Sequence, residues 1–174
     1  LLIFWRDTLD SSLTHKSVEK NTEKGVPKDM LQSLLKAAMS AHSADDERPW
    51  HFIVIKDQSV LEQISKIQKL AYMVAQAPAA IIVCGDKTLQ KHRGFWIQDC
   101  AAATQNLLID ANKLKINATW EGIYPIEGRI QQYSKLLKTP EYVIPFSLVV
   151  LGFAVEYRVS GNKFDKKRIH YDRW

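Results

Sequence analysis

The feature that most constrains this fold is an unbroken run of apolar side chains from Ala79 to Cys84. A strand that faces water on one side alternates apolar and polar residues, whereas a strand covered on both sides is apolar throughout. Two other segments are also typical of strands, a short one at Phe52–Ile55, which we expect to be buried, and a longer one at Phe146–Phe153, after Pro145. The sequence therefore predicts a central sheet with helices covering it.

Four segments have the apolar spacing of the helices that could cover such a sheet. The first spans Lys28–Ala41, the third Phe95–Leu114 and the fourth Glu127–Lys138. The third is small or apolar around much of its circumference, which predicts burial on more than one side. The second follows Ser59, which we expect to cap it in a capping box with Glu62. With no repeat or long linker, residues 1–174 are expected to form one domain.

Composition excludes several classes of protein. The 24 basic and 19 acidic residues leave a net charge of +5, but the basic residues are scattered, so we expect no nucleic-acid partner. No apolar run could cross a membrane, and Cys84 and Cys100, both in apolar contexts, suit buried thiols in a reducing cytoplasm. There is no dinucleotide or phosphate-loop glycine motif, no zinc spacing among the five histidines, and hence no metal site expected.

The stretch from Leu35 to Phe52 joins the end of a helix to a strand through a short polar loop. Such a junction creates a mouth where a flat ligand can lie. It resembles the flavin loop of the nitroreductase family, whose usual text is close to A-P-S-x-x-N-x-Q-P-W-x-F. The positions that match this text are Ala41, Ser43, Pro49, Trp50 and Phe52. The positions that differ from it are His42 for proline, Asp46 for asparagine and Arg48 for glutamine.

The resemblance, which runs from about residue 14 to the C-terminus, implies an α+β fold with a mainly antiparallel sheet and an intertwined homodimer. Residues 1–13 would precede it as an N-terminal segment, and residues 156–174 would form an extension packed on the partner subunit. The implied activity is ping-pong hydride transfer from NADH or NADPH through FMN to a small electron-poor acceptor, such as a nitroaromatic or a quinone. FMN would carry the chemistry, so no catalytic side chain is expected.

Two basic segments match positions that hold the FMN phosphate in this family. In the first, His15, Lys16 and Ser17 match, whereas Glu19 replaces a basic residue. In the second, near the C-terminus, Arg168 is the first candidate and Lys166 the second. The alternative for each segment is an ordinary solvated charged face, which is the usual meaning of a charge run.

The flavin-like loop supplies two further candidates. The resemblance places Asp46 at the pyrimidine edge of the ring, where a carboxylate accepts from the ring N3–H but cannot donate. Arg48 could offset the charge of Asp46. The alternative, of about equal weight, is an acidic loop exposed to water.

The segment Thr119–Pro125 is the most specific of the internal motifs. Glu121 and Gly122 match a family loop that lies over the flavin and directs a main-chain N–H at N5, and Trp120 adjoins them. A glycine there lets the backbone approach a planar ring closely. The alternative is an ordinary turn between a strand and a helix.

A different class of protein also stays open. Glu19, Asp46 and Arg48 together replace a typical flavin-gripping set, so the fold could serve a dimeric protein that binds or stores flavin without catalysis. A yellow protein that NAD(P)H bleaches would indicate the enzyme, and a protein that stays colourless with added FMN would exclude it.

Overall fold

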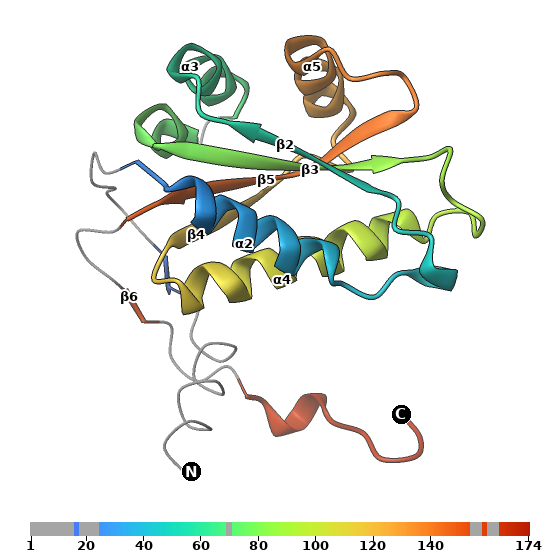
Figure 1. The fold of residues 1–174 in the computed structure, drawn as a ribbon. Helices are drawn as coiled ribbons and strands as arrows, with labels where there is room; N and C mark the ends of the chain where they lie inside the picture. The colour runs from blue at the N-terminus through green and yellow to red at the C-terminus, as the bar shows by residue number, and fades with distance from the viewer. Residues whose placement is uncertain (1–15, 18–24, 69–70, 154–157, 160–163) are drawn as a thin grey trace.

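A computed structural model of the chain describes residues 16–17, 25–68, 71–153, 158–159 and 164–174 (Figure 1). The candidate phosphate-site residue His15 lies outside these ranges, as do Glu19 and the N-terminal segment 1–13. The side chains of Lys16 and Ser17 are likewise outside the description.

The centre of the molecule is a sheet of four antiparallel strands, in the order β2-β3-β5-β4. Their bounds are Trp50–Ile55 for β2, Ala79–Asp86 for β3, Val143–Gly152 for β5 and Asn117–Gly122 for β4. The two apolar runs of the sequence, β3 and β5, are the inner strands. This arrangement confirms the expected antiparallel sheet.

Helices cover both faces of the sheet, as the apolar run in β3 predicted (Figure 1). On one face lie α2 (Lys28–Met39) and α4 (Trp96–Lys113), which pack against each other. On the other face lie α3 (Gln58–Ile67) and α5 (Glu127–Leu137). The chain is therefore built in three layers, with the long helix α4 in contact with all four strands.

Alternate residues of β3 belong to different cores. Ile81 and Val83 pack in the cluster that contains α2 and α4, whereas Ala80 and Ile82 pack in the cluster that contains α3 and α5. All four are fully buried. Because burying each isoleucine side chain stabilises the fold by roughly 1.5–3 kcal/mol, a polar residue anywhere in this run would be costly.

The edge strand β2 corrects one expectation. The sequence predicted a buried strand, but His51 and Val54 are exposed, and only Trp50 and Ile55 are buried. β2 has a single neighbour among the described strands, so an apolar sequence here did not mean burial on both sides.

The cap of α3 corrects a second expectation. Asp57 occupies the N-cap and accepts from the main-chain N–H groups of Ser59 and Val60, while Ser59 lies within the helix. An aspartate two residues earlier satisfies the same unpaired helical N–H groups. The capping box with Glu62 is therefore wrong.

The sequence did not predict β4, which turns the segment expected to be a loop into a strand that ends at Gly122. It pairs with β5 from Asn117 to Gly122. Near the start of β5, the register with β3 shifts, so that Ser147 faces Val83 and Pro145 faces Cys84. Such an irregularity re-aims the side chains around it.

Short elements complete the described chain. The two-residue strands β1 (Lys16–Ser17) and β6 (Arg158–Val159) pair with each other. Short 3₁₀ helices occur at η1 (Ala44–Asp46), η2 (Ala71–Gln76) and η3 (Lys166–Arg168). Cys84 and Cys100 are buried free thiols, as expected, and burial raises the pKa of Cys84 to about 12.

Candidate functional site

The flavin-like loop of the sequence is held in a strained backbone conformation. Asp45, Asp46 and Arg48 have φ angles of 48°, 54° and 46°. These angles are left-handed and unfavourable for any residue with a Cβ atom. Three such residues within four positions persist only when surrounding contacts determine the conformation.

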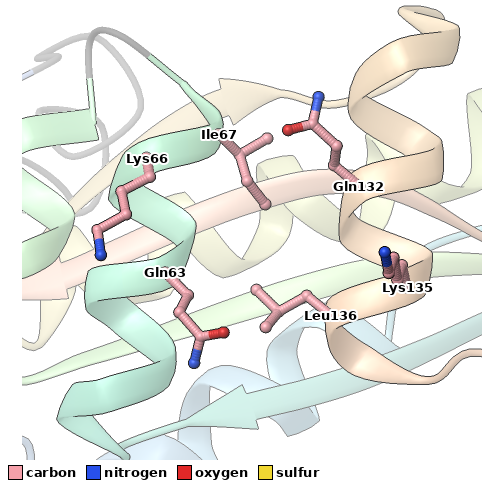
Figure 2. A pocket seen from close by; sticks show the side chains of 6 residues that line it. All are labelled: Gln63, Lys66, Ile67, Gln132, Lys135 and Leu136. Atoms are coloured by element: carbon pink, nitrogen blue, oxygen red, sulfur yellow. The ribbon is translucent and has the colours of Figure 1, made fainter.

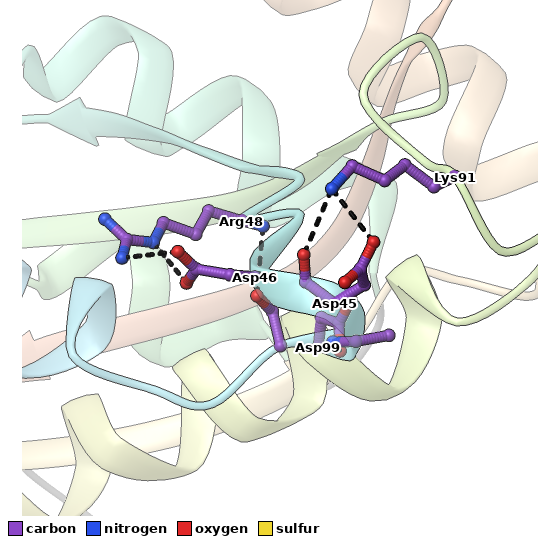
Figure 3. A network of polar contacts seen from close by, with 7 residues as sticks. Asp45, Asp46, Arg48, Lys91 and Asp99 are labelled. Carbon is purple, nitrogen blue, oxygen red and sulfur yellow. Dashed lines mark hydrogen bonds and ion pairs between the residues drawn. The ribbon is translucent and has the colours of Figure 1, made fainter.

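Within this loop, Asp46 and Arg48 bind each other. Arg48 Nε donates to Asp46 Oδ1 at 2.7 Å and Arg48 Nη2 donates to Oδ2 at 2.8 Å (Figure 3). The Arg48 main-chain N–H also donates to Ser43 Oγ at 3.0 Å. The two candidates therefore form one exposed, bidentate pair, and this pair raises the pKa of Arg48.

Glu47 ties the loop to the body of the protein. Its side chain is buried, and Oε1 accepts the main-chain N–H groups of Lys91 and His92, each at 2.6 Å. A second link lies at the surface, where Lys91 Nζ donates to the Asp45 carboxylate at 3.0 Å and to the Asp45 carbonyl at 3.2 Å (Figure 3). Sequence reasoning missed Glu47 because its partners lie more than 40 positions away.

Asp99, in the first turn of α4, provides a further link. Its Oδ1 accepts the main-chain N–H of Ala44 at 3.0 Å, and its other oxygen has no hydrogen-bond partner. Burial raises the pKa of Asp99, the negative charge of Glu47 raises it further, and the bond from Ala44 lowers it. The net effect is a raised pKa, so the carboxylate form is disfavoured here.

The end of β4 is the second candidate region, and Gly122 is its most accessible residue. Gly122 is exposed, and a Cβ atom placed on it would meet only the Tyr124 carbonyl oxygen, at 3.8 Å. Its φ lies outside the left-handed range. Neither the backbone conformation nor the described neighbours require glycine here, which leaves close approach of a ligand as a reason for it.

Two side chains fix the Gly122 carbonyl. Arg129 Nη1 donates to it at 2.7 Å from α5, and Gln68 Nε2 donates at 3.4 Å. The next two main-chain N–H groups, of Ile123 and Tyr124, both donate to the Phe146 carbonyl. The backbone at the end of β4 is therefore held on both sides, by residues that the sequence did not single out.

An aromatic cluster connects this strand end to the start of α4. The Tyr124 ring lies 5.1 Å from that of Trp96, and Phe146 lies 6.2 Å from both Trp96 and Trp120, measured between ring centroids. Asp99, the anchor of the flavin-like loop, is one turn along the same helix. The structure therefore brings Asp46 and Arg48 and the β4 candidates to the same end of α4.

The remaining candidates are the basic residues of the two predicted phosphate segments. The backbone of β1, which holds Lys16 and Ser17, lies against β4. Lys166 and Arg168 lie on η3 in a tail whose described residues are all exposed, and Figure 1 shows this tail leading away from the sheet and its helices. Within the tail, Arg168 Nε contacts the Asp165 carboxylate at 3.4 Å. Within the described chain, Lys166 and Arg168 therefore do not lie beside the end of β4.

A separate groove of about 450 Å³ lies between α3 and α5 (Figure 2). It is lined by Gln63, Lys66, Ile67, Gln132, Lys135 and Leu136. Because α3 and α5 cover the opposite face of the sheet from α4, this groove is not the site that the sequence predicted. In the part of the chain that the structure describes, no helix has the length and apolar character needed to span a bilayer.

Comparison with known proteins gives consistent similarities. The family described as "Nitroreductase family" matches residues 15–80. A protein of Methanothermobacter thermautotrophicus provisionally named NADH dehydrogenase/NAD(P)H nitroreductase is 44% identical over 168 residues, which cover 97% of this chain and 88% of that protein. A crystal structure from Parabacteroides distasonis with the same provisional name has a TM-score of 0.92 at 33% identity, covering 97% and 99% of the two chains. The Bacillus subtilis protein named FMN reductase [NAD(P)H] is 23% identical over 181 residues, covering 95% and 73%.

Proposed function

This chain belongs to the nitroreductase family, and on that premise we propose that it transfers a hydride from NADH or NADPH to an electron-poor acceptor with FMN as prosthetic group. The family supports the reaction class, and the name of the Bacillus subtilis relative supports the cofactor. The proposed acceptors are small molecules such as nitroaromatics and quinones.

The observation that carries the proposal is the open backbone at Gly122. A Cβ atom there would occupy space that no described side chain fills, and Trp120 and Tyr124 border the same strand end. A planar ring is the kind of ligand that benefits from a glycine in this setting. The residues present therefore fit a flavin.

When bound, FMN would supply the two-electron chemistry at its N5 atom. The chain would hold it with the backbone at Glu121 and Gly122, and Arg129 and Gln68 would keep that backbone in place. Trp120 would help to exclude water, because its ring packs on Phe146 beside the strand end.

The other proposed contacts come from polar residues. Asp46 would accept an N–H of the pyrimidine edge, and Arg48 would neutralise the carboxylate, as it already does in its bidentate pair with Asp46. His15, Lys16 and Ser17 would hold the phosphate. The backbone of β1 lies near that of β4, which supports a single site for phosphate and ring.

We propose that the working protein is a homodimer in which the C-terminal extension packs on the partner subunit. Tyr171 is 84% exposed and Trp174 fully exposed. Large aromatic side chains left in water on one tail favour an interface. Lys166 and Arg168 would then reach a phosphate in the partner's site rather than in their own.

One observation favours the second candidate, a dimeric flavin-binding or storage protein without catalysis. Both oxygens of Asp46 already accept from Arg48. The loop therefore offers fewer hydrogen bonds to the edge of a flavin than the asparagine usual in the family would. The enzyme and the storage protein differ in whether NADH or NADPH reduces the bound flavin. Anaerobic NADH or NADPH should bleach the yellow enzyme, whereas a storage protein would keep its colour.

The substitution Gly122→Val tests the proposed site. We expect FMN affinity, measured by flavin fluorescence quenching, to fall at least about tenfold, with little change in the urea unfolding midpoint. The matched control is Gly25→Val, since Gly25 is also exposed and a Cβ atom added to it would meet nothing within 4 Å. Equal FMN affinity in both variants would remove Gly122 from the flavin site.

A further inference from the structure

The loop Ser43–Arg48 contains three consecutive carboxylates, and they differ in their surroundings. Asp45 and Asp46 are exposed, whereas Glu47 is only 8% exposed. The exposed carboxylates face Lys91 and Arg48 at the surface. A buried carboxylate is rare unless hydrogen bonds compensate for the lost water, so the contacts of Glu47 show what it does.

Those contacts are main-chain N–H groups, not cations. Glu47 Oε1 accepts from Lys91 N and His92 N at 2.6 Å each. Hydrogen bonds to a charged acceptor are stronger than neutral ones. Because they go to the backbone, they bind the segment around Lys91 and His92 regardless of which side chains it carries.

The residues on either side of Glu47 are the strained ones. Asp46 and Arg48 are both left-handed, whereas Glu47 itself has ordinary helical angles, with φ −64° and ψ −33°. Glu47 lies between these two residues, and its buried carboxylate is bonded to the body of the protein. The backbone on both sides of Glu47 is therefore restricted in the directions it can take. The bonds that Glu47 makes therefore help to hold Asp46 and Arg48 in this conformation, together with the bond from Arg48 N to Ser43 Oγ.

Asp99 holds the other end of the same loop. It accepts the Ala44 N–H, three residues before Glu47. Each acid keeps one oxygen without a hydrogen-bond partner, at Glu47 Oε2 and Asp99 Oδ2. Two buried acids thus fasten the loop near its two ends. Asp99 fastens it to the start of α4, and Glu47 fastens it to the segment that precedes α4.

We infer that Glu47 is a positioning residue, whose buried carboxylate clamps the strained loop so that Asp46 and Arg48 are presented together to the ligand. The inference rests on the proposed function in one respect, namely that the loop contacts FMN. The clamp itself is a property of the chain alone and can be measured without ligand.

The experiment compares Glu47→Gln and Glu47→Ala with the wild-type full-length chain. Glutamine keeps the size and an acceptor oxygen but loses the charge, whereas alanine removes the acceptor. Amide hydrogen exchange at Lys91 and His92 is measured first, without FMN. We expect exchange to quicken roughly tenfold for glutamine and more for alanine, because charged acceptors bind more strongly than neutral ones.

FMN affinity and the steady-state constants are measured next. We expect FMN binding to weaken in the same order, wild type, glutamine, alanine. The apparent KM for FMN should rise, whereas kcat at saturating FMN should change little, because the loop holds the flavin and carries no reacting group. The control is Lys91→Ala, which removes the surface contact to Asp45 but keeps the Lys91 N–H bonded to Glu47.

The outcomes distinguish the clamp by Glu47 from the proposed contact of the loop with FMN. Graded exchange together with graded FMN affinity, both unchanged in Lys91→Ala, supports the inference. Unchanged exchange in Glu47→Ala overturns the clamp. Faster exchange with unchanged FMN affinity overturns the presentation of Asp46 and Arg48 to flavin, and it locates the failure in the proposed placement of the loop rather than in the clamp.

Discussion

The two regions that meet at the start of α4 are held in opposite ways. The loop Ser43–Arg48 depends on a few polar bonds and contains three left-handed residues. The end of β4 depends on strand pairing with β5 and on the aromatic rings of Trp96, Tyr124 and Phe146. One region is polar and strained, and the other is largely apolar and regular.

The difference suggests that the two regions have different roles in the proposed enzyme. Apolar packing resists small movements because interiors are close-packed, so the β4 end suits a fixed support for a ring. Polar loops open at lower free energy, so the loop suits an adjustable contact. Substitutions in the aromatic packing beside the β4 end should therefore cost more stability than substitutions of the loop's surface charges.

The largest effect is expected for Trp96→Ala. Trp96 is 5% exposed, and its loss would leave a cavity between Tyr124 and Phe146, so the free energy of unfolding should fall by about 3–5 kcal/mol. Urea denaturation measures this change. The neighbouring Phe95 is 46% exposed, and Phe95→Ala should cost under about 0.5 kcal/mol. Similar losses in both variants would contradict the role of the aromatic cluster.

A smaller effect is expected for Arg129→Ala. The Gly122 carbonyl would lose its 2.7 Å donor, and one such bond corresponds to roughly a fivefold loss of FMN affinity. Stability should change little because Arg129 is on the helix surface. Titration of FMN into both proteins checks this, with Arg129→Lys as the control that restores one donor. An affinity that is insensitive to both changes would mean that the carbonyl needs no anchor.

The substitution Asp99→Asn should change the free energy of unfolding in a way that depends on pH. Burial and the charge of Glu47 raise the pKa of Asp99, so its favourable contribution is present below the unfolded value of 3.8 and is lost as pH rises through the raised pKa. Asparagine keeps an acceptor for Ala44 without the charge, so the stability of the variant relative to wild type should increase as the pH rises.

Urea unfolding of both proteins from pH 4 to pH 7 tests this expectation. The difference in unfolding free energy should grow in favour of asparagine with rising pH. Parallel curves would show that Asp99 carries the same charge in the folded and unfolded chains.

The smallest effect is expected for Asp45→Asn. Lys91 holds the pKa of Asp45 below its usual value through a hydrogen bond and its charge, but the pair is exposed and screened by salt. We expect no measurable shift of the thermal midpoint at about 150 mM salt. A clear loss of stability would mean that the loop depends on its surface charges, and the contrast with buried Glu47 would fail.

Much of the fold could be predicted from the chain, because local periodicity reports burial. The apolar run in β3 implied cover on both faces, and the small residues of α4 implied a helix enclosed by its surroundings. The strand β4 was missed because Trp-Glu-Gly lacks alternation and its residues are only half-buried. The cap of α3 was assigned to Ser59 because Asp57 fits the same role equally well from sequence.

The candidate site was less predictable. Its residue types came from a resemblance to a family, and their grouping at the start of α4 came from the structure. Glu47 looked like one more acid in a solvated run, yet it is the buried one. Arg129 carried no signal at all, since nothing local reveals that its guanidinium reaches the Gly122 carbonyl.

The sequence by itself determined that β3 and β5 are buried, where helices begin and end to within a few residues, and which family the chain resembles. Side-chain periodicity and turn chemistry act over a few residues, so they are legible in the chain. Only the tertiary structure decided which acid is an anchor, which acid has a raised pKa, and which donors hold the end of β4. Those properties depend on neighbours that lie up to 55 positions apart in the chain, and burial of a charge is defined only once those neighbours surround it.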